Sequence, residues 1–326
     1  MSLKYLVTGG SGFIGSALTH RLVSEGHHVR VLDNNSRGRA RRLDSISDKI
    51  EFIEGDIRNS NTVTEATRGV DCVCHLAYVN GTEFFYSQPE LVLDIAVRGM
   101  INVIDACREA NVRNLVLASS SEVYQTPESV PTNESAPLII PDITNPRYSY
   151  GGGKILCELM AMCYGRKDFD RVTIFRPHNV YGPDMGWEHV IPQLSVKATK
   201  AAKNTKKGPV TLMVQGDGSH TRAFVHIDDF IDGLMCVVNE GNHGELYHIG
   251  TQEELSISEV ARIIVSCFDR DFVLEHEPEP KGGTPRRCPD ISKLKKLGYK
   301  PRISFNKGVR SVVNWYAEHS EKREQL

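Results

Sequence analysis

The chain has 326 residues, of which 40% are hydrophobic and 25% are charged, and its formal net charge is -2. This is the composition of an ordinary globular protein, long enough for one large domain or two smaller ones. The slight negative charge gives no electrostatic reason to expect nucleic acid or an anionic membrane as a partner. No apolar run approaches the length of a bilayer span, and the N-terminus does not resemble a signal peptide.

The eight cysteines are scattered, and none has the spacing of a metal-ligand pair. Cys72 and Cys74 lie within an apolar run, where a cysteine usually behaves as a small core residue. Unpaired thiols of this kind are typical of a reducing compartment. We therefore expect a cytoplasmic protein without a metal site.

A glycine-rich turn joins the first expected strand to the first expected helix. The β-type run at residues 4–8 leads into Gly9-Gly-Ser-Gly12-Phe-Ile-Gly15, and apolar residues at helical spacing follow over residues 16–25. In this context Gly9 makes the tight turn, Gly12 lets the backbone approach a pyrophosphate, and Gly15 lets the helix pack on the strand. We predict that a dinucleotide binds here, with a plain strand-to-helix turn as the alternative.

The second expected strand, residues 29–33, ends in an acid. Asp33 lies about 20 residues beyond Gly15, where a carboxylate accepts the adenosine ribose hydroxyls and repels a 2′-phosphate. NAD is therefore favoured over NADP, although Arg37 and Arg39 could receive that phosphate. Asp56, at the end of a third expected strand over residues 50–57, is a candidate to contact the adenine amino group.

A continuous apolar run at residues 72–77 predicts a strand that is covered on both faces, with His75 as a core histidine. The aromatic-rich loop 78–90 follows it, on the side where open α/β sheets bind ligands. An amphipathic helix over residues 91–111 and a strand over residues 114–121 come next. The serines that end this strand place Ser120 where its hydroxyl can bond a substrate oxygen, unless it only caps the next segment.

Tyr150 and Lys154 are one helical turn apart. An ammonium close to a phenol favours the phenolate, so the pair predicts a lowered Tyr150 pKa and a general base. The three glycines at 151–153 each cost a helix about 1 kcal/mol relative to alanine. The segment is therefore expected to leave the helix or to bring its backbone close to another group. The alternative is a glycine-rich turn with an incidental Tyr and Lys.

Together these motifs resemble the extended short-chain dehydrogenase/reductase superfamily, and more narrowly its nucleotide-sugar epimerases, dehydratases and decarboxylases. The resemblance covers nearly the whole chain. It continues through Arg176-Pro-His-Asn-Val-Tyr-Gly-Pro183, Thr221-Arg222-Ala-Phe-Val-His-Ile-Asp228 and Arg286-Arg-Cys-Pro-Asp290. Two positions depart from the family pattern, because Ala96 replaces the usual Asn of its helix and Gln125 replaces the usual Gly after Val-Tyr.

The resemblance implies an α/β fold with a Rossmann-type doubly wound parallel sheet and a smaller mixed α/β C-terminal substrate-binding lobe. The NAD-binding domain would span residues 1–178 and the nucleotide-sugar-binding lobe residues 179–326, interleaved near residues 179–230. A homodimer through the helices near residues 91–111 and 150–167 is also expected from the family, with neither nucleic acid nor membrane as a partner.

The resemblance also implies roles for individual residues. Ser120, Glu122, Tyr150 and Lys154 would form the catalytic set, and Lys154 would hold both Tyr150 and the nicotinamide ribose. The residues expected around NAD are Gly9, Gly12, Phe13, Ile14, Gly15, Asp33, Asp56, Ile57, Leu76, Ala77, Tyr150, Lys154 and Pro177. The implied substrate is a nucleotide-diphosphate sugar, and the residues expected to contact it are Ser121, Asn179, Val190, Arg222 and Arg287. Forked guanidinium groups suit the oxygens of a diphosphate.

The chemistry shared by the family is a transient oxidation, in which Tyr150 would take the proton of the sugar 4-hydroxyl while hydride passes from C4 to NAD. If hydride returns to the other face of the 4-keto sugar, the product is the 4-epimer. If the C5 proton is removed and water is lost, the enzyme is a 4,6-dehydratase. If C5 carries a carboxylate that leaves as CO₂, the enzyme is a decarboxylase. Glu122 is more typical of the last two classes, whereas Ser121 replaces the acid of many dehydratases. A sugar-nucleotide 4-epimerase is preferred because that activity is common in the family. A UDP-glucuronate-type decarboxylase, a 4,6-dehydratase and a non-catalytic NAD-binding sensor or scaffold are the alternatives.

Overall fold

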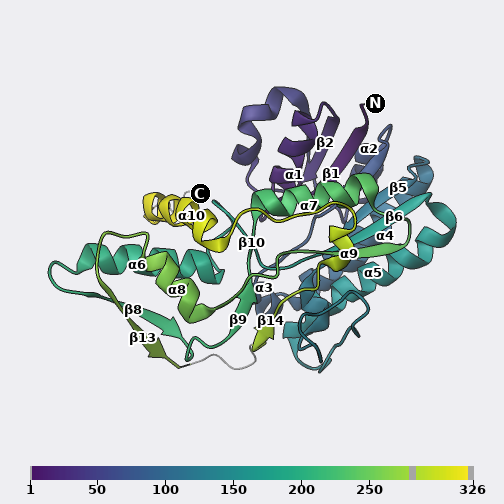
Figure 1. The fold of residues 1–326 in the computed structure, drawn as a ribbon. Helices are drawn as coiled ribbons and strands as arrows, with labels where there is room; N and C mark the ends of the chain where they lie inside the picture. The colour runs from purple at the N-terminus through teal and green to yellow at the C-terminus, as the bar shows by residue number, and fades with distance from the viewer. Residues whose placement is uncertain (1, 279–283, 322–326) are drawn as a thin grey trace.

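The computed structural model describes residues 2–278 and 284–321. Its centre is a sheet of seven parallel strands in the order β11-β6-β5-β4-β1-β2-β3 (Figure 1). The strands are β1 (Lys4–Thr8), β2 (His28–Asp33), β3 (Ile50–Glu54), β4 (Cys72–His75), β5 (Asn114–Ala118), β6 (Arg171–Pro177) and β11 (Glu245–Ile249). The strand order reverses beside β1, and a ligand of such a sheet binds at this switch point, outside the carboxyl ends of the strands.

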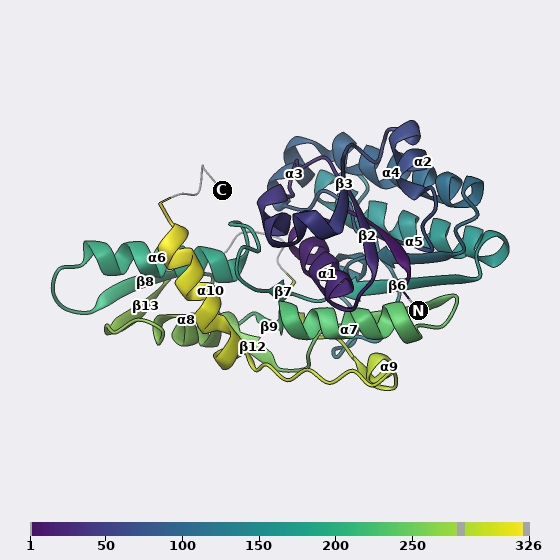
Figure 2. The same ribbon diagram turned by 90° about the horizontal axis from the view of Figure 1, so that it is seen from above.

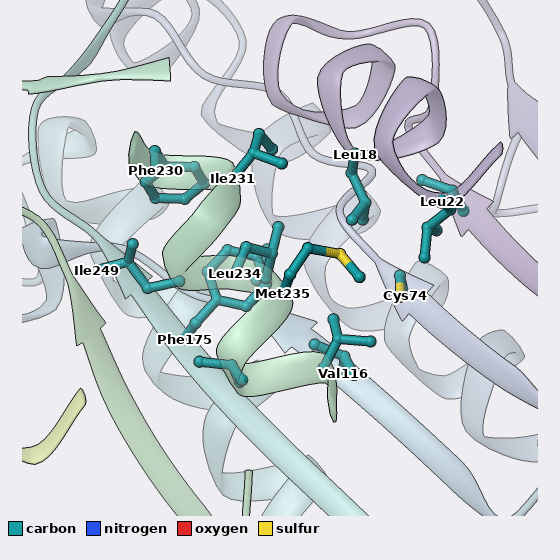
Figure 3. Packing of buried hydrophobic residues seen from close by; sticks show 14 of the residues in the cluster. Leu18, Leu22, Cys74, Val116, Phe175, Phe230, Ile231, Leu234, Met235 and Ile249 are labelled. Atoms are coloured by element: carbon teal, nitrogen blue, oxygen red, sulfur yellow. The ribbon is translucent and has the colours of Figure 1, made fainter. Parts of the chain in front are cut away.

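Helices cover both faces of this sheet (Figure 2). On one face lie α1 (Phe13–Ser24) and α7 (Ile227–Glu240), and on the other α2 (Ser60–Thr67), α4 (Pro89–Glu109) and α5 (Ser149–Asp168). A hydrophobic core lies between the sheet and the helices on each face. Successive strand side chains point into opposite cores: Tyr5 and Val7 lie in the core with α1 and α7, and Leu6 lies in the core with α2, α4 and α5. Leu18 and Leu22 of α1 face Met235 of α7 over the sheet in Figure 3. The predicted doubly wound fold is confirmed.

A smaller lobe packs around a third hydrophobic cluster at one end of the sheet. Its main elements are α6 (Val190–Asn204), α8 (Ile257–Val265), α10 (Phe305–His319), β8 (Val210–Gln215) and β13 (Phe272–Glu277). The short elements of the chain are η1 (Ala40–Lys49), α3 (Thr82–Ser87), η2 (Ser121–Tyr124), η3 (Pro146–Tyr148), β7 (Val180–Tyr181), β9 (Thr221–Ala223), β10 (Val225–His226), β12 (Glu254–Ser256), β14 (Arg286–Arg287) and α9 (Ser292–Lys295). The mixed α/β lobe expected after the sheet is therefore present.

The division into residues 1–178 and 179–326 stays a prediction. The two parts of the chain interleave further along the sequence than residues 179–230, because α7 packs on the sheet and β11 pairs with β6. Residues 227–249 thus belong to the layered sheet, and the smaller lobe is built from the segments on either side of them.

Local structure differs from the sequence expectation at the aromatic loop 78–90, which contains a short helix, α3. The run from Tyr150 to Lys154 lies wholly inside α5, so of its two expected outcomes only the close approach of its backbone to another group applies. Within residues 2–278 and 284–321, no helix is long and apolar enough to cross a membrane, and no group of three or more His, Cys, Asp and Glu could hold a metal ion. All eight cysteines are free thiols.

A buried ion pair fixes α5 against the sheet. Glu158 of α5 accepts hydrogen bonds from Arg176 Nε at 2.7 Å and from Arg176 Nη2 at 2.5 Å, and both side chains are buried. Arg176, on β6, also donates to the hydroxyl of Tyr124 in η2. Two parallel hydrogen bonds compensate for the loss of hydration that two buried charges suffer. The pair therefore links the helix that carries Tyr150 and Lys154 to the end of β6.

We predict that Glu158→Ala lowers the free energy of unfolding by about 3 kcal/mol, because Arg176 is left buried without its counter-charge. Urea unfolding followed by circular dichroism measures this. Glu321→Ala is the control, since Glu321 is an exposed partner of exposed Lys203 and its loss should cost about 1 kcal/mol or less. Equal losses in the two variants would contradict a structural role for the buried pair.

Candidate active site

A cavity of about 1250 Å³ lies between the carboxyl ends of the strands and the smaller lobe. Residues that follow β1, β2, β4, β5 and β6 line one side of it, and residues of α6, β8 and β9 line the other. Every residue predicted from the sequence to be catalytic, to contact the cofactor or to contact the substrate lines this cavity. The fold thus brings together positions that are spread over the chain from Gly9 to Arg287.

The glycine turn has the geometry that a pyrophosphate requires. Gly9 has a φ of 73°, and a Cβ added there would lie 2.7 Å from the backbone N and Cα of Ala77. A Cβ on Gly15 would lie 2.0 Å from the carbonyl oxygen of Gly9, so only glycine permits this close packing of helix on turn. Helix α1 begins directly after Gly12, and its first residues line the cavity. The N-terminal N–H groups of such a helix form an anion site.

Two carboxylates mark the expected adenosine end. Asp33 is buried, and its oxygens accept hydrogen bonds from the backbone N–H groups of Ser11 at 3.0 Å and Asn35 at 2.9 Å. Asp56 accepts from Arg58 Nη2 at 2.8 Å, and this bond lowers the pKa of Asp56 to about 2. Arg37 also lines the cavity, where its guanidinium lies 5.1 Å from the centre of the Phe84 ring. Both anions can therefore accept hydrogen bonds from a ribose or an adenine.

The proposed base lies at the other end. Tyr150 is buried, stacks on Phe85 at 5.0 Å between ring centres, and lies beside Ser120. Burial raises the pKa of Tyr150 to about 12, because desolvation of the phenolate outweighs the opposing effect of the neighbouring Ser120 hydroxyl, and the charge of Glu122 raises it further. The lowered Tyr150 pKa expected from the sequence is therefore wrong for this structure. An ammonium one turn away does not offset a fully buried phenol.

Lys154 is also buried, and its ammonium donates to the carbonyl oxygen of Ala118 at 2.8 Å. The Lys154 Nζ atom lies 3.9 Å from the centre of the Tyr78 ring. Burial lowers the pKa of Lys154 to about 8. His75 is the buried histidine that was expected, bonded to the Thr8 hydroxyl at 2.7 Å, and burial with the nearby Lys154 charge lowers its pKa to about 3.

The glycine run owes its presence to close packing. A Cβ on Gly151 would lie 2.8 Å from Gln125 Nε2, and a Cβ on Gly153 would lie 2.2 Å from the hydroxyl oxygen of Tyr78. Gln125, where the family usually has Gly, keeps a φ of 53°, which is uncommon for a residue with a side chain. Of the roles considered for the run, the contacts match tight packing, since these glycines accommodate Gln125 and Tyr78.

Two arginines face each other at the substrate end. Strand β14 pairs with β9 so that Arg287 lies opposite Arg222. Arg287 Nη1 donates to Glu122 Oε1 at 2.6 Å, and burial followed by the charge of Arg287 lowers the pKa of Arg222 to about 10. Burial alone would raise the pKa of Glu122, but the charges of Arg287, Arg147 and Arg222 outweigh it and lower that pKa. Two adjacent guanidinium groups in a cavity favour a doubly charged anion.

Asn179 and Val190 lie at the same end. The Asn179 amide donates to the carbonyl oxygen of Ala223 at 3.2 Å, which ties it to β9, and Val190 is the first residue of α6. Ser121 is buried beside Ser120 at the start of η2. All three line the cavity, but their roles toward a substrate stay predictions.

Sequence reasoning missed several side chains of the cavity. Tyr78 and Phe85 contact Tyr150, and they belong to the aromatic loop that was assigned to the ligand side without naming individual residues. Arg147 also lines the cavity, and the sequence had indicated it only as part of Pro146-Arg147-x-x-Tyr150, a motif that resembles UDP-glucuronate decarboxylases, without a role in the site. Trp187 also lines the cavity, from a connection whose sequence has no periodic pattern.

The chain matches the sequence profile of the NAD dependent epimerase/dehydratase family over residues 5–250. It belongs to this family. It is 30% identical over 330 residues to the UDP-N-acetyl-alpha-D-glucosaminuronate decarboxylase of Bacillus cytotoxicus, covering 98% of this chain and 99% of the relative. It is 32% identical over 327 residues to the UDP-glucose 4-epimerase of Mycolicibacterium smegmatis, covering 98% of this chain and 100% of the relative.

The crystal structure of DesIV, a dTDP-glucose 4,6-dehydratase from Streptomyces venezuelae with NAD and TYD bound, is similar throughout. The TM-score is 0.86 at 30% identity, and the match covers 99% of both chains. The family assignment confirms an enzyme with NAD as its cofactor. The family members similar to this chain catalyse three different reactions at about the same identity, so the reaction itself is not decided by similarity.

We predict that Tyr150→Phe lowers turnover by at least about 100-fold and leaves NAD binding within about twofold, because only the proton-accepting hydroxyl is lost. Turnover of a nucleotide sugar and titration with NAD measure the two effects. Tyr148→Phe is the control, since it removes a phenol two residues away that does not line the cavity. Near-normal turnover of Tyr150→Phe would contradict its role as the base.

Proposed function

We propose that this protein is a nucleotide-sugar 4-epimerase that acts through a transient 4-keto sugar. The observation that carries this proposal is the position of buried Tyr150 beside Ser120, with Lys154 one turn away, in the same cavity as the Arg222–Arg287 pair. A proton acceptor for a sugar hydroxyl and a cationic site for a diphosphate are the two elements that such a reaction requires.

Each group has a defined task in this proposal. The glycine turn and Asp33 hold NAD, which, when bound, supplies the hydride acceptor and a positive charge that favours the Tyr150 phenolate. Tyr150 takes the proton of the sugar 4-hydroxyl, and the Ser120 hydroxyl orients the same oxygen. Lys154 holds the nicotinamide ribose and keeps a positive charge beside the phenol.

The arginine end holds the remainder of the substrate. Arg222 and Arg287 bind the diphosphate, and Asn179 donates to one of its oxygens. Val190, at the start of α6, contacts the nucleoside. Ser121 contacts the sugar beside Ser120. Cationic groups that are already in place when substrate enters need no reorganisation during the reaction.

Epimerisation is favoured over dehydration by the state of Glu122. This carboxylate is held by Arg287, and its lowered pKa makes it a weak base for removing a proton from sugar C5. A dehydratase also needs an acid for the departing hydroxyl, and Ser121 stands where many dehydratases have one. Return of hydride to C4 needs neither group, so the Ser120–Tyr150 pair is sufficient for a 4-epimerase.

Decarboxylation is the second candidate, and a separate observation favours it. Arg147 lies close enough to Glu122 to lower its pKa, in addition to Arg222 and Arg287. This third guanidinium could receive a carboxylate at C5 of the sugar. Loss of CO₂ from a 4-keto acid breaks the C5–C6 bond and leaves its electrons as an enolate of the ketone, which then takes up a proton at C5. The step requires no removal of a C5 proton. A weakly basic Glu122 is therefore no obstacle to it.

A homodimer is the proposed assembly. Helices α4 and α5 pack side by side, and each carries exposed apolar side chains, among them Leu93 at 42% and Leu159 at 59% exposure. Arg108 of α4 lies over the ring of Tyr164 of α5, so the outer faces of the two helices are adjacent. An exposed apolar surface of this kind is typical of a subunit interface, and a second copy related by two-fold symmetry would cover it.

We predict that the products of a panel of UDP-, GDP-, dTDP- and CDP-sugars have the mass of the substrate and an inverted C4, as shown by mass spectrometry and NMR. Protein with the Tyr150→Phe substitution is the control for contaminating activity. A product that has lost CO₂ would establish the second candidate. A product that has lost water would contradict both candidates.

We predict that Leu159→Arg converts the dimer to a monomer in light scattering after size-exclusion chromatography, because an unpaired charge would be buried at the interface. Val273→Arg is the control, since Val273 is an equally apolar residue of the smaller lobe with 47% exposure. An unaltered dimer in the Leu159 variant would show that another surface is used.

A further inference from the structure

Two sequence features that the proposed function does not explain meet at one side chain, Tyr78. They are Ala96, which replaces the usual family Asn, and the glycine run of α5. A Cβ added to Gly153 would lie 2.2 Å from the Tyr78 hydroxyl oxygen and 3.0 Å from the Cβ of Ala96. The end of the Tyr78 side chain therefore occupies a niche between α4 and α5 that exists because residues 96 and 153 are small.

The hydroxyl gains no hydrogen bond in this niche. The Tyr78 oxygen is buried and has no partner among the residues that the structure describes. A buried hydroxyl without a partner costs free energy, so hydrogen bonding is not what holds the ring there. What the chain gains must come from the contacts of the aromatic ring itself.

The ring contacts both members of the proposed catalytic pair. Its centre lies 3.9 Å from Lys154 Nζ, which is a cation–π contact between buried groups, and such contacts are strongest when desolvated. It also lies 5.2 Å from the Tyr150 ring centre at an interplanar angle of 87°, in edge-to-face contact. Phe85 stacks on Tyr150 separately, with an interplanar angle of 24°. Tyr150 is thus held by two aromatic rings.

We propose that Tyr78 is a positioning residue for Tyr150 and Lys154, whose ring stabilises the Lys154 ammonium and sets the direction of the Tyr150 phenol. The niche made by Ala96 and Gly153 anchors that ring. This inference rests on the proposed function, since it takes Tyr150 as the base and Lys154 as its cationic partner. Tyr78 is not itself a proton donor or acceptor in the reaction.

The other groups around Lys154 show why the ring matters. On α5, Cys157 and Glu158 face it, β4 contributes the neutral His75, and β5 contributes the carbonyl oxygen of Ala118. Glu158 is already engaged by Arg176 in two hydrogen bonds. The remaining direct contacts of the ammonium are one carbonyl oxygen and the π face of Tyr78.

Loss of the ring should therefore destabilise the protonated form of Lys154. The pKa of Lys154 is already lowered to about 8 by burial, and the proton is held at neutral pH. The cation–π contact opposes that effect, because it favours the charged form. Without it the pKa falls further, so activity that needs the ammonium is lost at a lower pH as the pH rises.

The first test compares Tyr78→Leu with Tyr78→Phe in the full-length protein. In Tyr78→Leu, kcat should fall about tenfold, KM should stay within about threefold, and the alkaline limb of the kcat profile should move down by about one pH unit. Tyr78→Phe keeps the ring, so its kcat and the pH dependence of its kcat should match those of the wild-type protein. A purely structural role would lower kcat equally at every pH, so an unshifted limb in Tyr78→Leu would overturn the proposal.

The second test uses the niche and needs no substrate. Gly153→Ala should lower the melting temperature by several degrees, because its Cβ meets the Tyr78 hydroxyl. The double variant Tyr78→Phe/Gly153→Ala should recover part of this loss, since the 2.2 Å contact is removed and that Cβ would lie 3.6 Å from the former Tyr78 Cζ, while its 3.0 Å approach to the Ala96 Cβ remains. Gly152→Ala is the matched control, because its Cβ meets only the end of the Ile140 side chain.

The two tests separate the two proposals. If no nucleotide sugar is converted, the proposed function fails, while the rescue of Gly153→Ala by Tyr78→Phe still reports on the niche. If turnover is found but the double variant is no more stable than Gly153→Ala alone, Tyr78 is not anchored as described and the positioning role fails.

Discussion

A buried lysine ammonium in the wall of the cavity is the constraint on which the active site depends. Removing Lys154 from water disfavours its charge, and few groups nearby compensate for this. The Ala118 carbonyl oxygen at the end of β5 and the Tyr78 ring after β4 do so directly. The Arg176–Glu158 pair acts less directly, since it holds the helix that carries Lys154 on the end of β6. The environment of the Lys154 ammonium thus depends on the placement of three strands, β4, β5 and β6, and of helix α5.

The other end of the cavity has the opposite electrostatic character. Pairing of β9 with β14 places Arg222 opposite Arg287, and burial followed by the charge of Arg287 lowers the pKa of Arg222. Glu122 offsets part of that repulsion through its bond with Arg287. In the proposed function, a diphosphate would relieve the rest, because the cationic groups are in place before it binds. Glu122 then has a structural reason to be present that is independent of proton transfer.

The same scaffold accommodates three reactions in the family, and the geometry here explains why similarity does not separate them. In the proposed function, the glycine turn, the carboxylate of Asp33 and the Tyr150–Lys154 pair serve the oxidation that all three reactions share. The proposal assigns the fate of the 4-keto sugar to a few groups at the substrate end of the cavity, Ser121, Glu122 and Arg147. These side chains are too few to change the identity over a chain of this length.

Local sequence patterns were sufficient to predict much of the fold and of the cofactor site. The alternation and length of its apolar runs predicted the parallel strands, and the spacing of Gly9, Gly12 and Gly15 predicted the dinucleotide turn, because such features depend on near neighbours in the chain. The resemblance to a family supplied the residues of the smaller lobe that line the cavity. Helix boundaries and the short helix α3 were less accessible, since end effects and packing decide them.

The tertiary structure alone decided the charges and contacts within the site. The spacing of Tyr150 and Lys154 predicted an easily ionised phenol, yet the fold buries both groups so deeply that desolvation outweighs their proximity. The packing role of Gly153 and Ala96 could not be predicted from the sequence either, because their common neighbour, Tyr78, comes from a third segment of the chain. The sequence by itself determined which groups are present and on which elements they lie. Only the folded chain decided how much water surrounds them and which distant side chains they touch, since both depend on long-range packing.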